Sequence, residues 1–445
     1  MERAEMRILK TWKATATRKP MIIRGARQVG KTWLMKEFGR QQYEQVAYVN
    51  FESSANLKGL FQDNFDIRRI LTALQIETGI TIVPATTLLI FDEIQEAPGA
   101  ISSLKYFQEN APDYHIVTAG SLLGVALNNH QSFPVGKVDF LELYPLSYSE
   151  FLEAAGEKPL AELLKVPDWP LITTFKVKFM ERLKQYYFIG GMPEAVRSFV
   201  TNGDFKLVRT IQQQILTGYE QDFSKHAPTD IIPRIRMLWN SIPAQLAKEN
   251  KKFIYGLIRS GARAKEYELA MSWLIDCGLI HKVHNISHPG IPLKAFEELS
   301  AFKLFLGDVG LLSAMTGLDV KTLLDGNDIF ETFKGALTEQ YVLQQLLTLP
   351  GLPVYYWTPN NAKAEMDFVV QHTGKVIPIE VKAAENLQAK SLKVYCDKYM
   401  PALAVRASLS DYRPEGWMVN VPLYAIETID LLASAVPTSP ITATI

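Results

Sequence analysis

One stretch decides the fold: Gly25-Ala26-Arg27-Gln28-Val29-Gly30-Lys31-Thr32, preceded by the apolar residues Met21-Ile22-Ile23 and followed by Trp33 at the start of a helix-like run. Its spacing, Gly-x-x-x-x-Gly-Lys-Thr between a strand and a helix, is that of a phosphate-binding loop. The two glycines permit positive φ, so backbone N–H groups turn inward and meet the helix N-terminus around one anion. The stretch predicts that residues 25–33 bind ATP or ADP; the alternative is a glycine turn in another kind of α/β protein.

Two side chains of this loop and two acids carry the expected chemistry. Lys31 would reach the β- and γ-phosphates, and the Thr32 hydroxyl would take one coordination position on Mg²⁺. The apolar run of residues 87–91 ends in Asp92 and Glu93, at what would be the carboxyl edge of a parallel sheet. Asp92 can hold Mg²⁺ through its water shell, and Glu93 can polarise the attacking water. The alternative is that these acids are helix N-caps.

The composition is that of a neutral globular protein. The chain has 445 residues, with 47 Lys plus Arg and 47 Asp plus Glu, so no global field draws it to nucleic acid or membrane. The two cysteines, Cys277 and Cys396, have neither metal-ligand spacing nor partners for a disulfide framework. No apolar run approaches the length of about 18 residues that a membrane span needs. We therefore expect a soluble, cytoplasmic protein without a membrane partner.

Residues 1–150 alternate strand and helix patterns, which predicts one domain built on a parallel sheet. Further strands are expected near residues 46–51, 115–118 and 138–143. The fourth strand ends in Thr118-Ala119-Gly120-Ser121. Ser121 is the candidate for a catalytic hydroxyl that senses the γ-phosphate, with Thr118 second; either hydroxyl could instead cap a turn or helix.

Four motifs in this order, GARQVGKT, LLIFDE, TAGSLLG and YPLSYSEF, resemble a group of prokaryotic AAA-type ATP-binding proteins whose carboxyl half is a domain of unknown function. The likeness continues through Gly190-Gly191-Met192-Pro193-Glu194, Asp308-Val309-Gly310-Leu311-Leu312 and Ile379-Glu380-Val381-Lys382. The resemblance implies a nucleotide-driven protein and a homo-oligomer in which a neighbouring copy completes each site with an arginine.

The chain departs from that group at Lys137, where Gly-Arg is common. A lysine cannot make the planar bidentate contact of a guanidinium. Arg24 and Arg27, beside and within the loop, are alternative sources of positive charge, unless they serve only packing or face solvent.

The middle of the chain is predicted to be helical at 151–229, a lid or linker, and winged-helix-like at 230–325. Gly190 and Gly191 interrupt the helices, either as a turn or as a phosphate contact through their N–H groups. Basic residues dominate 232–265 and are interleaved with Trp239, Phe253 and Tyr255. This segment could contact nucleic acid phosphates or dock a protein. Its basic residues are Arg234, Arg236, Lys248, Lys251, Lys252, Arg259, Arg263 and Lys265.

Residues 326–432 are predicted to form a small α/β domain, followed by a loose tail at 433–445. A hairpin around Thr373-Gly374 would place Asp367 beside Glu380 and Lys382 on one face. This arrangement resembles the nuclease-like fold named for its Asp and Glu-x-Lys residues. The resemblance implies Mg²⁺ on Asp367 and Glu380, with Lys382 and the helical Glu339 assisting. The alternative is an ion pair on a sheet face.

These interpretations lead to three hypotheses. In the first, Mg²⁺-dependent ATP binding and hydrolysis drive conformational change in the winged-helix-like and nuclease-like segments. The second is a DNA-binding or regulatory protein that the nucleotide switches, with slow hydrolysis. The third is an ATP-gated nuclease.

Overall fold

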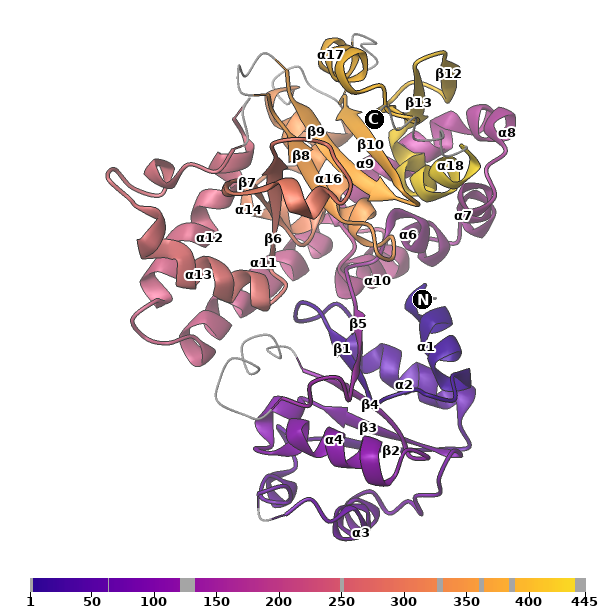
Figure 1. Ribbon diagram of the computed structural model, residues 1–445, viewed down its shortest axis with the longest axis vertical. Coiled ribbons are helices and arrows are strands. Elements are labelled where there is room, and N and C mark those ends of the chain that lie inside the picture. Colours follow the sequence, from indigo (N-terminus) through magenta and orange to yellow (C-terminus); the bar gives the residue numbers. More distant parts are fainter. Residues whose placement is uncertain are drawn as a thin grey trace, which may run out of the picture. The chain divides into compact units, whose positions relative to one another are not determined.

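The computed structural model describes residues 3–62, 64–120, 133–248, 252–325, 331–359, 364–383 and 389–436. The chain divides into two compact units. Unit 1 is Met1–Pro145 with Ser272–Leu279, and unit 2 is Leu146–Met271 with Ile280–Ile445. In the ranges just given, no helix is both long and apolar enough to cross a membrane. The expected order, an α/β domain followed by helices and a mixed sheet, is confirmed (Figure 1).

Unit 1 contains a parallel sheet whose strand order, within the described residues, is β2-β3-β4-β1-β5. Leu89 and Phe91 of β3 pack in one core with residues of α3 and α4. Gly39 of α2 lies against Leu88, so helices cover both faces of the sheet. The elements are α1 (Glu5–Ala14), β1 (Met21–Arg24), α2 (Lys31–Gln42), β2 (Gln45–Asn50), α3 (Ile67–Thr78), β3 (Thr87–Asp92), α4 (Ala100–Asn110), β4 (His115–Ala119) and β5 (Asp139–Glu142).

The strand order places the phosphate-loop strand β1 between β4 and β5, and β3 on the other side of β4. Because all these strands run in the same direction, their carboxyl ends meet at one edge of the sheet. The loop after β1, the acids after β3 and the end of β4 therefore share that edge.

Unit 2 begins with a helical region, as the apolar spacing predicted. Helix α9 ends at Ile189 and is followed by Gly190, whose φ is +73°, and α10 begins at Pro193. The helices are α6 (Tyr148–Ala154), α7 (Lys158–Lys165), α8 (Trp169–Thr174), α9 (Lys176–Ile189), α10 (Pro193–Asn202), α11 (Phe205–His226), α12 (Ile232–Leu246) and α13 (Ala264–Asp276), the last residues of α13 belonging to unit 1.

The turn at Gly190 and Gly191 packs closely against Asp308. The Gly191 N–H donates to Asp308 Oδ2 at 2.6 Å, and a Cβ on Gly190 would lie 2.1 Å from Asp308 Oδ1. Asp308 also caps α14 (Val309–Met315) and accepts a bond from Gln344 of α16 (Glu331–Leu347). Since the Gly191 N–H is engaged by a buried carboxylate, the turn interpretation accounts for the motif and the phosphate contact does not.

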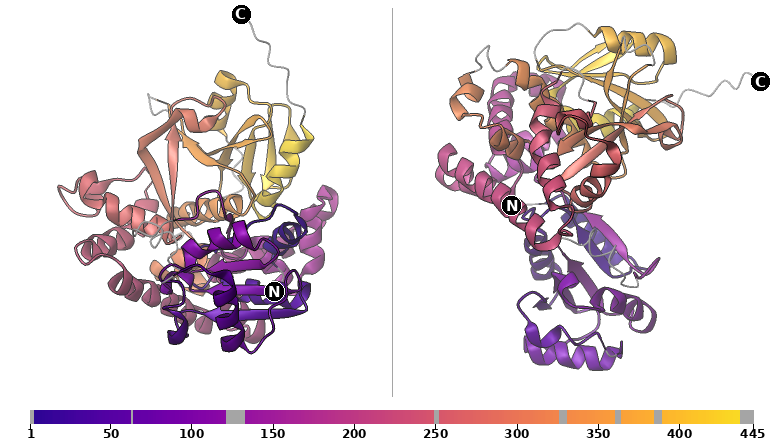
Figure 2. Two further views of the ribbon diagram at one scale, coloured as in Figure 1. Left: turned by 60° about the horizontal axis from the view of Figure 1, so that its bottom comes forward. Right: turned by 90° about the vertical axis from the view of Figure 1, so that its left-hand side faces the viewer.

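The second sheet of the described chain has the order β12-β13-β11-β10-β9-β8-β6-β7. Figure 1 labels most of its strands, and Figure 2 gives two further views of the ribbon. The β6–β7 hairpin, expected as a wing, joins this sheet because Asn285 of β6 pairs with Tyr356 of β8. The winged-helix-like and nuclease-like segments thus share one sheet across residue 325. The remaining elements are β6 (Ile280–Ile286), β7 (Glu297–Leu306), α15 (Val320–Asp325), β8 (Val354–Trp357), β9 (Met366–His372), β10 (Lys375–Val381), α17 (Lys390–Tyr399), β11 (Val405–Ser408), β12 (Arg413–Glu415), β13 (Met418–Pro422) and α18 (Ile429–Ala435).

Candidate nucleotide-binding site

The loop between β1 and α2 has the backbone of an anion nest. Three of its residues have positive φ: Gly25 at +140°, Gln28 at +68° and Gly30 at +98°. Gly30 directly precedes the first residue of α2. A Cβ on Gly25 would lie 2.1 Å from the Leu143 carbonyl oxygen, so only glycine fits there. These φ values, together with the helix start after Gly30, are the backbone conformation that a phosphate-binding loop requires.

Lys31 folds back onto this loop. Its Nζ donates to the carbonyl oxygens of Gly25 at 2.9 Å and Ala26 at 2.8 Å. Burial lowers the pKa of Lys31 to about 8, although the nearby Glu93 and Asp92 act in the opposite direction. A phosphate would give this ammonium an anionic partner in place of neutral carbonyls.

Asp92 links the acidic strand end to the loop. Its Oδ2 accepts hydrogen bonds from the Thr32 hydroxyl at 2.7 Å and the Tyr48 hydroxyl at 2.9 Å. Burial raises the pKa of Asp92, and these two hydrogen bonds oppose that shift. The structure therefore brings together Thr32 and Asp92, which were predicted separately from stretches about sixty residues apart.

The sequence interpretation missed Tyr48. It lies on β2, which pairs directly with β3, and Tyr48 is level with Ile90. The aromatic residue near a strand end was visible in the sequence, but which strand lies beside β3 was not.

The oxygens at this edge suit Mg²⁺. Thr32 and Asp92 offer a hydroxyl and a carboxylate, and Mg²⁺ commonly keeps several waters while binding one or two protein groups plus phosphates. A search of the described ranges found no set of three or more His, Cys, Asp or Glu side chains placed to hold an ion. A nucleotide-linked Mg²⁺ does not need such a set.

Glu93 follows Asp92 with a left-handed backbone, φ +49° and ψ +47°. This conformation is unfavourable by about 1–2 kcal/mol for a residue other than glycine. Glu93 Oε2 accepts a bond from Gln95 Nε2 at 2.6 Å, and the side chain is half-buried. Backbone strain at a half-buried acid beside the phosphate loop is typical of functional positions.

The other predicted site residues have different surroundings. Thr118 is fully buried, and its hydroxyl has no hydrogen-bond partner in the structure. Ser121, the first candidate for the γ-phosphate sensor, lies outside the described residues. Within the loop, Val29 is buried, Arg27 is half-buried, and Trp33 is 43% exposed.

Two basic side chains discussed as sources of charge are engaged elsewhere in unit 1. Arg24 Nη2 lies 2.5 Å from Glu142 Oε1, and its guanidinium lies over the Phe140 ring at 4.0 Å. Lys137 pairs with Glu109 at 2.9 Å. The contacts of Arg24 correspond to the packing alternative stated for it, and Lys137 forms an ion pair within unit 1.

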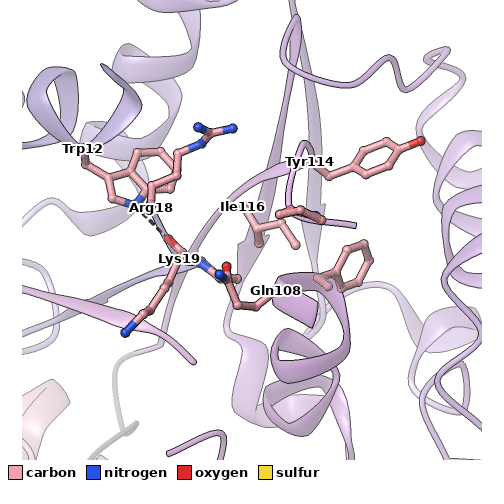
Figure 3. A pocket seen from close by; sticks show the side chains of 9 residues that line it. Trp12, Arg18, Lys19, Gln108, Tyr114 and Ile116 are labelled. Carbon is pink, nitrogen blue, oxygen red and sulfur yellow. Dashed lines mark hydrogen bonds between the residues drawn. The ribbon is translucent and has the colours of Figure 1, made fainter. Parts of the chain in front are cut away.

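A small pocket in unit 1 lies away from this edge. It is lined near the starts of β1 and β4 by Pro20 and Ile116, together with Trp12, whose indole N–H donates to the Lys19 carbonyl at 2.7 Å (Figure 3). Because the phosphate loop follows the carboxyl end of β1, this pocket is at the opposite edge of the sheet and is not the nucleotide site.

In unit 2 the predicted hairpin brings Asp367 and Glu380 together. The β9–β10 register, continued by one pair, sets these residues opposite each other. Asp367 Oδ2 accepts the Val381 N–H at 2.7 Å. Glu380 is 3% exposed; its Oε1 lies 2.9 Å from Lys382 Nζ, and its Oε2 is buried without a hydrogen-bond partner.

A second lysine, missed from the sequence, enters this cluster from β7. Lys303 is fully buried, forms an ion pair with Glu365 and lies 3.9 Å from Glu339 Oε2. Burial opposes the charged form of Lys303, but Glu339, Glu365 and Asp367 hold its pKa above the ordinary value. The carboxylates of this cluster are thus partly balanced by the buried ammonium of Lys303 and the half-buried ammonium of Lys382. Lys303 was a lone basic residue in an apolar run, a signal that indicates a buried partner but not which one.

In the basic segment at 232–265, two of the three aromatic residues are buried, whereas most of the described basic side chains are exposed. Trp239 and Phe253 are core residues, 1% and 6% exposed, so they cannot stack on nucleic acid. Tyr255 is half-buried. Arg259 pairs with Glu266 at 2.8 Å, and Lys251 lies outside the described residues. Exposed basic side chains remain at Arg234, Arg236, Lys252, Arg259, Arg263 and Lys265.

Three family models match the chain in succession. Residues 17–152 match the AAA domain, residues 180–322 match the domain of unknown function DUF8612, and residues 334–425 match the domain of unknown function DUF4143. Comparison with curated proteins gave no match.

Several solved structures are similar at low identity. The Walker-type ATPase PABY2304 of Pyrococcus abyssi is 15% identical, with 70% of this chain and 94% of that chain covered and a TM-score of 0.43. The RuvB Holliday junction branch migration motor of Thermotoga maritima is 16% identical, with 62% and 87% covered and a TM-score of 0.26. Aeropyrum pernix ORC1 in complex with DNA is 12% identical, with 71% and 92% covered and a TM-score of 0.27.

The AAA match covers the sheet and loop described above, and the loop has the geometry that phosphate binding requires. Residues 17–152 are therefore an AAA domain with a phosphate-binding loop, and a domain of unknown function follows at residues 334–425.

Proposed function

We propose that this protein binds ATP with Mg²⁺, hydrolyses it, and uses the turnover to change the conformation of its winged-helix-like and nuclease-like segments. The observation that carries the proposal is the 2.7 Å hydrogen bond from Thr32 to Asp92, which joins the phosphate loop to the acidic strand end. ATP hydrolysis requires the phosphate loop and the acidic strand end to lie together, because Thr32 and Asp92 would hold the same Mg²⁺.

Each residue has a stated task. The loop N–H groups and the ammonium of Lys31 bind the phosphates. Thr32 and Asp92 would hold Mg²⁺, which supplies charge neutralisation of the phosphate oxygens. Glu93 accepts a proton from, and orients, the attacking water. Ser121, with Thr118 as second candidate, would report the γ-phosphate.

The test is nucleotide binding and phosphate release by the purified full-length protein. We expect Lys31→Ala to lose ATP binding, because it removes the ammonium group that lies against the Gly25 and Ala26 carbonyls inside the loop. Glu93→Gln should bind ATP and turn over about 10²- to 10⁴-fold more slowly, the range for loss of a general base. Lys10→Ala, an exposed change on α1, is the matched control. Normal turnover by Glu93→Gln would refute its role.

The rate distinguishes a motor from a switch. Typical enzymes turn over at about 1–10³ s⁻¹. Hydrolysis slower than roughly one event per minute, unchanged by DNA, favours a nucleotide-switched binding or regulatory protein. The exposed basic residues of 232–265 then provide the candidate nucleic acid surface. The substitutions Arg263→Glu and Lys265→Glu reverse the charge of two of these side chains and test that surface. If the two residues contact phosphates, the salt dependence of DNA binding should decrease.

A second candidate function, an ATP-gated nuclease, is supported by the juxtaposition of Asp367, Glu380 and Lys382, with Glu380 Oε2 buried and not hydrogen-bonded. The ion-pair alternative is supported by Lys303, which already supplies a cation to Glu365 and Glu339. Plasmid, single-stranded DNA and RNA are incubated with the protein and Mg²⁺ or Mn²⁺, with and without ATP. Cleavage that disappears in Asp367→Ala establishes the nuclease; no cleavage under any condition leaves a binding or scaffolding domain.

The resemblance to AAA-type proteins also motivates a proposal of self-association. Arginines within unit 1 near the loop are engaged or half-buried, so a neighbouring copy is the proposed source of an additional arginine. Sedimentation with and without ATP tests this; a monomer in both conditions would exclude it.

A further inference from the structure

We propose that Arg3 is a positioning residue of the phosphate loop, an inference that rests on the proposed nucleotide binding. Arg3 is 4% exposed and reaches the loop from the residues just before α1. Its Nη1 donates to the Val29 carbonyl oxygen at 3.0 Å, and its Nη2 donates to the Tyr144 carbonyl oxygen at 2.7 Å. One guanidinium therefore ties the loop to the segment after β5.

The direction of the Val29 carbonyl matters for anion binding. A loop that binds phosphate through its N–H groups must turn its carbonyl oxygens away from the anion, because they carry partial negative charge. Val29 directly precedes Gly30, the residue before α2. The charge-assisted hydrogen bond from Arg3 holds the Val29 carbonyl oxygen toward Arg3 and away from the proposed anion. It also fixes the orientation of the Gly30 N–H, which belongs to the same planar peptide group.

The same segment after β5 also contacts the other end of the loop. The Leu143 N–H donates to the Arg24 carbonyl at 2.8 Å, and the Leu143 carbonyl lies where a Cβ of Gly25 would be. Residues 143–144 thus hold the chain directly at the Arg24 carbonyl, just before the loop, and through Arg3 at the Val29 carbonyl. The four residues between these anchors, 25–28, have their ends fixed before a nucleotide arrives.

Arginine is suited to this position. Its planar fork donates to two carbonyls at the same time, whereas a lysine offers a single ammonium. The buried charge has a nearby counter-charge, because Glu5 Oε2 lies 3.5 Å from Arg3 Nη2. A buried guanidinium with two carbonyl acceptors and a carboxylate neighbour is satisfied in place, so it can act as a fixed anchor.

The experiment compares full-length wild type with Arg3→Lys and with Arg3→Met combined with Glu5→Gln, which removes the buried pair together. Arg7→Met is the matched control, since Arg7 is exposed on the same helix. Circular dichroism and thermal melting establish that each variant is folded. Hydrogen exchange of the amides of residues 26–31 is measured without nucleotide, and the Kd for fluorescent ADP and the KM and kcat for ATP are measured separately.

We expect faster amide exchange in the loop and a Kd for ADP raised about tenfold in the variant that combines Arg3→Met with Glu5→Gln, with KM rising more than kcat falls. Arg3→Lys should be intermediate because it retains one donor group. Exchange and Kd equal to wild type in both variants would overturn the role of Arg3. A wild type that binds no nucleotide would refute the proposed function, while the exchange comparison would still decide whether Arg3 fixes the loop.

Discussion

The lowered pKa of Lys31 makes nucleotide affinity depend on pH. Its ammonium is buried against the Gly25 and Ala26 carbonyls, and burial brings its pKa to about 8. Above that pH the free protein holds Lys31 mainly as a neutral amine, which cannot attract phosphate. Affinity should therefore fall as pH rises through 8.

The size of the effect follows from the titration. With a pKa of about 8, Lys31 is about nine-tenths charged at pH 7 and about one-tenth charged at pH 9. Only the charged fraction is competent, and the apparent Kd is the intrinsic Kd divided by that fraction. The Kd for ADP should thus rise about tenfold between pH 7 and pH 9, equivalent to about 1.4 kcal/mol.

Fluorescent ADP titrations at pH 7, 8 and 9 measure this, with circular dichroism at each pH to exclude unfolding. Phosphate groups, whose second pKa is about 6, are mostly ionised throughout this range. Lys31→Arg is the control, because a guanidinium stays charged at all three pH values. Any affinity that this variant retains should be independent of pH. A wild-type Kd that changes less than twofold would refute the reasoning.

Three further predictions concern groups that the structure brings together. Gly25→Ala should destabilise unit 1 by about 2 kcal/mol or more and abolish ADP binding, because its Cβ would meet the Leu143 carbonyl at 2.1 Å; a urea midpoint equal to wild type would contradict this. Tyr48→Phe removes one of two donors to Asp92 Oδ2 and should lower ATP turnover at limiting Mg²⁺ by roughly fivefold, about 1 kcal/mol, with little change in melting temperature; unchanged Mg²⁺ dependence would count against it. Asp308→Ala removes the acceptor of the buried Gly191 and Leu311 N–H groups and one of the two acceptors of Gln344 Nε2, and urea denaturation should show a loss of about 3 kcal/mol; a loss below about 1 kcal/mol would mean that other groups satisfy them.

Much of the nucleotide site could be predicted because its signals are local. Gly25 and Gly30 indicate positive φ, and a strand before Lys31 with a helix after it defines the loop. Asp92 and Glu93 were recognisable because an apolar strand ends in acids. The hairpin at Thr373-Gly374 was equally local, and both turn residues have positive φ.

Only part of the role of Gly190 and Gly191 could be predicted from the sequence. Its helix break follows from Gly190 and Gly191 themselves. That Asp308, more than one hundred residues later, accepts the Gly191 N–H depends on how α9 and α14 pack, and no local pattern encodes that packing. The basic segment was misleading for the same reason: Trp239 and Phe253 could not be recognised as core before the packing of α12 and β7 was known.

By itself the sequence determined the element types, the phosphate loop and its acids, since backbone conformation and charge are properties of a few consecutive residues. Tertiary structure alone decided which distant groups meet: Tyr48 at Asp92, Lys303 among the carboxylates, and Arg3 on the Val29 carbonyl. Such contacts depend on strand order and on the burial of charged groups with partners far away in the chain. Burying a charged side chain costs free energy unless an oppositely charged or hydrogen-bonding group lies beside it. Only the folded chain decides which group that is.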